Sequence, residues 1–225
     1  MQTRPTIEEM IDGATPLVGR LSAQNRTRLS FLVDLFLEDA TFEGADGFQL
    51  TPHILVSIAT QACFLLVRRR EDRFGRRIKI LVHEDMIDRQ RHLMGRFSPS
   101  GLIELNWMDV KRGGFLPNDG CNVVMHEFAH KLDSKNWNVD GVPLLHSPVC
   151  HGNWRRIMGE EYERFKAQVD NGEFTPLNPY AATHPAEFFA CATEALFEQP
   201  KMLREHYPRV FDRLVHFYGD ADLET

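Results

Sequence analysis

Apolar side chains recur at helical spacing along much of this chain. Residues 22–39, "SAQNRTRLSFLVDLFLED", begin with Ser22, a residue type that commonly caps the N-terminus of a helix. The pattern predicts an amphipathic helix whose buried face is formed by Leu29, Leu32, Val33 and Phe36. The later pattern predicts three more helices, over residues 154–169, 185–197 and 200–217.

The most apolar segment is "HILVSIATQACFLLV", residues 53–67. Thr51 stands at the cap position before it and Pro52 in the first turn, where proline is favoured. The segment is shorter than a bilayer span and carries the polar residues Ser57 and Gln61. We therefore expect a buried core helix and no membrane anchor.

Two strand-like stretches follow, residues 77–83 and 101–107, bounded by Gly, Ser and Pro. We expect the glycines of residues 111–120, "KRGGFLPNDG", to end the strand region, and a polar loop to cover residues 134–153. Helices outnumber strands, and the strands cluster in the middle of the chain. The pattern predicts an α+β fold, mainly helical, with a small central sheet.

Composition narrows the classes of function. At 225 residues, with 43% hydrophobic side chains, the chain fits a single domain over residues 1–225, with a helical part to about residue 75 and a core at about 76–218. A net charge of −6 argues against direct nucleic-acid binding, and acids interrupt the basic run at 68–79, which we expect to be solvated. Four separated cysteines without a CxxC pair, and an N-terminus without an apolar signal region, favour a cytoplasmic protein.

The stretch "VVMHEFAHKLD", residues 123–133, carries an HExxH motif. Positions four apart share one helix face, so His126 and His130 can bind the same metal ion, and zinc suits imidazole ligands. Glu127 is rotated to the side, where it can reach a water molecule at the metal. The alternative is a chance pair of surface histidines. The apolar flanks argue against it, because a buried histidine needs a partner.

Two further questions stay open on residue pattern alone. Asp133 can orient a ligand through a hydrogen bond or merely be a carboxylate at a helix end. A third metal ligand is also required. Glu187 and Glu194, in the otherwise apolar segment 185–197, are the best candidates, and His184 comes next.

Three motifs together resemble the Mlc titration factor A family of cytoplasmic zinc-dependent peptidases. They are "VVMHEFAHKLD", "DGVPLL" and "PYAATHPAEFF", and the likeness runs from about Leu21 to about Tyr218. The catalytic core of that family resembles anthrax lethal factor, in which a tyrosine lies seven positions before the third ligand. The resemblance therefore implies Glu187 as ligand and Tyr180 as a hydrogen-bond donor to the oxyanion, and leaves Glu194 a supporting or structural role.

The resemblance also implies what the chain does. It predicts a zincin-like, gluzincin-type core that holds one Zn²⁺ per chain through His126, His130 and Glu187, with Glu127 as general base. The expected activity is peptide-bond hydrolysis, aminopeptidase-like and directed at small peptides or a protein substrate. The alternative is a regulatory binding module that sequesters a transcriptional repressor of the Mlc type, with peptidase activity secondary. An intact Glu127 favours catalysis.

Overall fold

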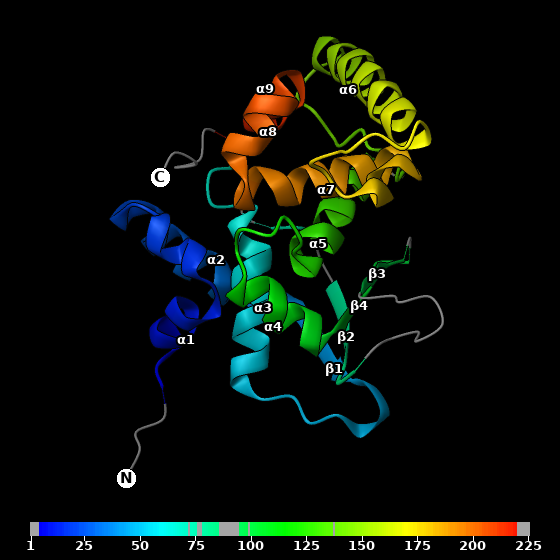
Figure 1. Cartoon of the computed structure of the whole chain (residues 1–225). Coiled ribbons are helices and arrows are strands. Elements are labelled where there is room, and N and C mark those ends of the chain that lie inside the picture. The colour runs from blue at the N-terminus through cyan, green and yellow to red at the C-terminus, as the bar shows by residue number, and fades with distance from the viewer. Residues whose placement is uncertain are drawn as a thin grey trace.

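The computed structural model describes residues 5–71, 73–75, 78–85, 95–98, 100–136 and 138–219. In these residues helices predominate over strands (Figure 1). The helices are α1 (Ile7–Ala14), α2 (Ala23–Asp39), α3 (Pro52–Phe64), α4 (Trp107–Phe115), α5 (Val123–Asp133), α6 (Pro148–Asp170), α7 (Pro185–Glu198), α8 (Pro200–His206) and α9 (Pro208–Tyr218). The strands are β1 (Ala40–Gly44), β2 (Ile78–His83), β3 (Gly95–Phe97) and β4 (Leu102–Asn106).

The four strands form one mixed sheet in the order β1-β2-β4-β3. β1 pairs parallel with β2, and β2 pairs parallel with β4, whereas β3 runs antiparallel to β4 at the edge. Alternate residues of β2 are buried, as expected for a strand with one face on the core, whereas β4 is buried on both faces from Ile103 to Asn106. The buried apolar residues of the two strands are Ile78, Ile80, Val82, Ile103 and Leu105. The prediction of a mainly helical α+β fold with a small sheet is confirmed.

The two N-terminal helices with clear sequence signals form as predicted. The Ser22 side chain accepts a hydrogen bond from the Asn25 amide at the start of α2, and the Thr51 side chain accepts one from the Ile54 amide at the start of α3. The predicted inner face of α2 is buried, and nearly every residue of α3 is buried. Capping and apolar spacing therefore fixed these helices locally.

Several elements differ from the expectation. Residues 107–115 form α4 although they include Gly113 and Gly114. Added side chains at these two positions would meet Asn122 and the Ala14 carbonyl oxygen, so the glycines allow the helix to pack closely against its neighbours. The strands β1 and β3 were not predicted. The expected helix over 200–217 is broken before Pro208, since proline lacks the amide hydrogen that a continuing helix needs. Helix α6 begins at Pro148, inside the expected loop.

The basic run at 68–79 was expected to be solvated, but part of it is buried. Within the part that the structure describes, the Arg69 side chain is buried, donates a 2.6 Å hydrogen bond to the Phe217 carbonyl oxygen and stacks on the Phe217 ring. Arg69 also pairs with Glu71 at 3.0 Å. It joins the segment after α3 to the last helix.

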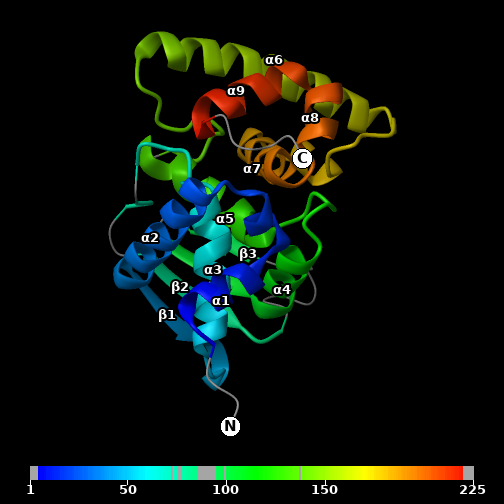
Figure 2. The same cartoon turned by 90° about the vertical axis from the view of Figure 1, so that its left-hand side faces the viewer.

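Helix α7 lies between two layers of the molecule (Figures 1 and 2). On one side are α6, α8 and α9, and on the other are α5 and the sheet with α1 to α4. This arrangement places the motif helix α5 directly against α7. The division of the chain near residue 75 stays a prediction, and β1 from the first part pairs with β2 from the second. No helix within the described ranges has both the length and the apolar character to cross a bilayer.

Candidate metal centre

Helix α5 is fixed at its start by a buried cap. The Asn122 side chain accepts a hydrogen bond from the Met125 amide at 3.0 Å and donates hydrogen bonds to the Gln61 side chain and the Gly113 carbonyl oxygen. Val124, Phe128 and Ala129 are fully buried. The apolar flanks of the motif therefore belong to the core, and the orientation of the helix is set by its packing.

Helix α7 brings Glu187 to α5. His184 is the N-cap residue of α7, with its Nδ1 accepting from the Ala186 amide at 3.1 Å, and Pro185 opens the helix as predicted. Glu187 lies in the first turn and faces the two histidines of α5. His184 is exposed and stands outside this group.

Three donor atoms converge here. The Nε2 atom of His126 lies 2.9 Å from Glu187 Oε2 and 3.2 Å from Nε2 of His130, and the latter lies 3.3 Å from the same oxygen. A tetrahedral zinc site with bonds of about 2.0–2.1 Å separates its ligand atoms by about 3.3 Å. Two imidazole nitrogens and one carboxylate oxygen in this triangle therefore fit a zinc ion that keeps a fourth position open.

A second carboxylate orients His126. The Nδ1–H group of His126 donates to Glu194 Oε1 at 2.7 Å, which leaves the Nε2 lone pair facing Glu187 and His130. The other oxygen of Glu194 accepts from the Asn122 amide at 2.5 Å. Glu194 is thus a partner of His126 and of the cap of α5, and it does not join His130 in a ligand group.

Asp133 contacts the loop that follows α5, whereas Glu194 contacts a histidine. Asp133 Oδ2 accepts from the Gly141 amide at 2.7 Å, so the carboxylate holds the loop that follows α5. Its Oδ1 and the Nδ1 of His130 are both buried, and neither has a hydrogen-bond partner among the residues that the structure describes. Burial raises the pKa of Asp133 to about 6, although hydrogen bonding to the loop acts in the opposite sense.

The pKa values of Glu187 and Glu127 are shifted in opposite directions. Burial acts to raise the pKa of Glu187, but hydrogen bonds with His126 and His130 outweigh it and hold that pKa well below its usual range. Glu127 is only 5% exposed, and burial raises its pKa to about 7. The first carboxylate is suited to bind a cation, and the second is suited to exchange protons near neutral pH.

Tyr180 lies beside the same group of side chains. It belongs to the short 3-10 helix η4 (Pro179–Ala182), which Asn178 caps, and its ring centre is 6.3 Å from that of His126. The side chain is 50% exposed, and in the described part of the chain its hydroxyl has no hydrogen-bond partner. Burial and the charge of Glu187 both raise its pKa, so the hydroxyl stays protonated and available as a donor.

Three features of the site were not predicted from the sequence. Gly95 on β3 contacts the Glu127 side chain. Cys191 lies near His126 and Glu194, and the three side chains form a second group that could hold a metal ion. Glu198, at the end of α7, is buried and accepts hydrogen bonds from the amides of Gly120 and Cys121. An apolar helix with three glutamates was a signal for the last of these, whereas nothing local indicates the others.

Comparison with known proteins shows the family of this chain. The model of the glucose-regulated metallo-peptidase M90 family matches residues 1–219, and the chain belongs to that family. Mlc titration factor A of Escherichia fergusonii is 28% identical over 99% of this chain and 88% of its own length. The protein of the same name from Klebsiella pneumoniae strain 342 is 28% identical over 94% and 85%. An uncharacterised protein of Synechocystis is 29% identical over 95% and 83%. The resemblance inferred from the three motifs is confirmed.

Proposed function

We propose that this chain is a zinc metallopeptidase that hydrolyses peptide bonds, with aminopeptidase-like activity on small peptides. The observation that carries the proposal is the convergence of His126, His130 and Glu187 on one triangle of donor atoms with edges of 2.9 to 3.3 Å. Membership of a metallopeptidase family supports the same reaction class. One zinc ion per chain is expected.

The roles of the residues follow from their positions. A zinc ion held there supplies Lewis acidity, which polarises the scissile carbonyl group and lowers the pKa of a water molecule. Glu127, with its pKa raised by burial to about 7, takes a proton from the attacking water and delivers it to the leaving amine. Tyr180 donates a hydrogen bond to the oxyanion that develops on the carbonyl oxygen.

A binding role is the second candidate. The relatives from Escherichia fergusonii and Klebsiella pneumoniae are named for titrating Mlc. We infer that a transcriptional repressor of the Mlc type, in the cytoplasm, is a partner of this chain. Binding needs no proton transfer, so Glu127→Gln should bind such a repressor as tightly as wild type. A repressor that binds neither form in a sedimentation or calorimetric titration removes this second function.

The same substitution tests the peptidase. Glu127→Gln keeps the shape of the side chain but cannot take the proton from water, so zinc content should stay at one per chain while hydrolysis falls about 100-fold or more. Zinc analysis and a panel of aminoacyl and peptide chromogenic substrates measure the two quantities. Glu163→Gln makes the same charge change at an exposed position of α6 and serves as control. Full hydrolysis by a zinc-free preparation would exclude the proposal.

A further inference from the structure

The edge strand β3 lies against the side chain of Glu127. A Cβ atom added at Gly95 would lie 2.7 Å from Oε1 of Glu127, 2.9 Å from its Cγ and 2.6 Å from Cγ2 of Val123. Real Cβ atoms essentially never make contacts this short. Any residue other than glycine at position 95 therefore forces Glu127, Val123 or the strand to move.

Glycine is needed at position 95 because a larger residue would clash with α5, and not because of the backbone conformation. Gly95 is absent from the glycines with positive φ, so its backbone conformation is open to any residue. The strand has little freedom to retreat, because Gly95 pairs with Leu105 of β4, and Leu105 is fully buried. On the other side, Val123 and Glu127 stand one turn apart on α5, a helix buried in the core.

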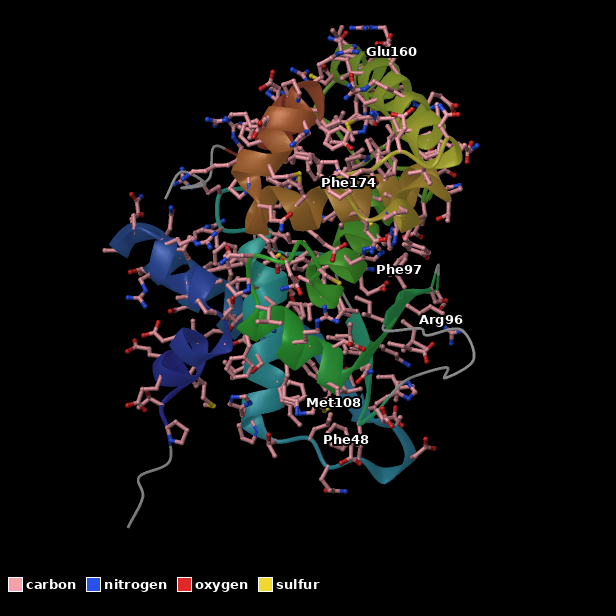
Figure 3. All side chains as sticks on the ribbon, viewed as in Figure 1. Phe48, Arg96, Phe97, Met108, Glu160 and Phe174 are labelled. Carbon is pink, nitrogen blue, oxygen red and sulfur yellow. The ribbon has the colours of Figure 1, made fainter. Side chains whose placement is uncertain are left out.

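The far end of β3 also contacts this face of α5. The Phe97 ring lies near Lys131, one helical turn beyond Glu127, with 5.9 Å between the Nζ atom and the ring centre. Figure 3 shows Phe97 and Arg96 on this strand, and the Arg96 side chain pairs instead with Glu104 of β4. Both ends of β3, Gly95 and Phe97, thus lie against α5.

We propose that β3, through the missing side chain of Gly95, is a positioning element that fixes the carboxylate of Glu127. The inference rests on the proposed function, since it assigns a role to the strand in the proton transfer carried out by Glu127. The strand restricts Glu127 to the rotamer that fits beneath Gly95. A carboxylate so confined pays little conformational entropy when it meets its water molecule.

Substitution of the glycine tests the role in catalysis. In Gly95→Ala, the added methyl group displaces the Glu127 carboxylate, and kcat should fall about 100-fold, as for other misplacements of about 1 Å. KM and zinc content should stay near wild type, because the substitution leaves His126, His130 and Glu187 in place. If the single variant does not fold, the same measurement is made in Val123→Ala/Gly95→Ala, which removes the nearest atom of the clash.

A control glycine separates this effect from loss of stability. Gly114 of α4 is buried, and a Cβ atom there would lie 2.5 Å from the Ala14 carbonyl oxygen and 3.2 Å from Nε2 of Gln61, a clash that involves neither Glu127 nor Val123. Gly114→Ala should lower the melting temperature and leave kcat per folded chain unchanged. Equal losses of kcat in Gly95→Ala and Gly114→Ala, or wild-type kcat in Gly95→Ala, would overturn the proposal.

A thermal cycle tests the contact without relying on activity. The melting temperature is measured for wild type, Gly95→Ala, Glu127→Ala and the double variant. The loss caused by Gly95→Ala should be smaller when Glu127 is already alanine, because the methyl group then has room. An equal loss in both backgrounds contradicts the contact. If the wild-type chain has no peptidase activity, the proposed function is wrong. The melting temperatures still test the contact between Gly95 and Glu127 in that case.

Discussion

The two ends of α7 use the same residue type in opposite ways. At the first turn, Glu187 is partly exposed, faces two imidazole rings and has a pKa well below the usual range. In the last two turns, Glu194 and Glu198 are nearly inaccessible and face backbone amides of residues 120–122. Burial raises the pKa of Glu198 to about 8, and the charge of Glu194 adds to this shift.

The difference shows that the partners of a carboxylate decide its role. At the open end, the partners are imidazole nitrogen atoms, a ligand type that suits zinc. At the buried end, the partners are amides just before α5, so the carboxylates fix the position of the helix that carries the histidines. Glu194 contacts both sets, since one oxygen meets His126 and the other the Asn122 amide. In the proposed function, the first turn of α7 supplies a metal ligand, and its last turns hold the helix that carries the other two ligands in place.

The largest effect is expected at the first turn. Glu187→Gln removes a charged donor atom from the triangle, whereas loss of an outer hydrogen-bond partner typically costs only about 10–100-fold in metal affinity. Zinc affinity should therefore fall by more than that range, and hydrolysis should be lost with the metal. Competition with a chromogenic chelator measures the dissociation constant, and Glu163→Gln is the matched control. Undiminished zinc in Glu187→Gln, with zinc lost from Glu194→Gln, would show that the two roles are reversed.

A smaller loss is expected for Glu194→Gln. An amide side chain has one acceptor oxygen, but Glu194 uses two, for the His126 Nδ1–H group and for the Asn122 amide. One donor is left facing an NH₂ group. Zinc affinity should fall by about 10–100-fold, and the melting temperature should fall as well. A variant that is destabilised but binds zinc as tightly as wild type would reduce Glu194 to a purely structural residue.

The features of the fold and the site that depend on residues close together in the sequence could be predicted. The caps and apolar faces of α2 and α3, and the two histidines one turn apart on α5, depend on neighbouring residues and were predicted. Strand β3 has only three residues and no alternation, and the glycines of α4 resemble a turn, so tertiary contacts decide both. The family resemblance, and no periodicity, singled out Glu187, which lies 61 positions from His126. The Gly95 contact depends on three-dimensional packing alone.

The hydroxyl of Tyr180 should matter for rate and little for binding. Tyr180→Phe removes a donor but keeps the ring beside His126, so zinc content and melting temperature should stay near wild type. If the hydroxyl stabilises the oxyanion, kcat/KM should fall on the order of tenfold or more. Steady-state kinetics on the best chromogenic substrate measure this. Wild-type kinetics would leave Tyr180 as an aromatic residue that packs near the site.

The smallest effect on catalysis is expected at the last turn of α7, where Glu198 should instead make stability depend on pH. The folded chain keeps a proton on Glu198 up to about pH 8, because burial, Glu194 and Asp119 all disfavour the charge. The unfolded chain releases that proton near the ordinary value of 4.5. Between these two values the folded state binds more protons, so the free energy of unfolding falls as pH rises from about 4.5 to about 8.

Glu198→Gln removes this proton and keeps the acceptor for the amides of Gly120 and Cys121. The difference in unfolding free energy between variant and wild type should therefore shift in favour of the variant as pH rises through that window, and urea titrations at pH 5.5 and pH 8.5 measure it. Comparison with wild type at each pH cancels the titration of groups that do not interact with Glu198. The kcat/KM value should change less than in Tyr180→Phe, because Glu198 meets backbone and no donor atom of the triangle. A constant difference across the window would mean that the Glu198 carboxylate is already charged in the folded chain, and the two ends of α7 would then differ in position but not in protonation.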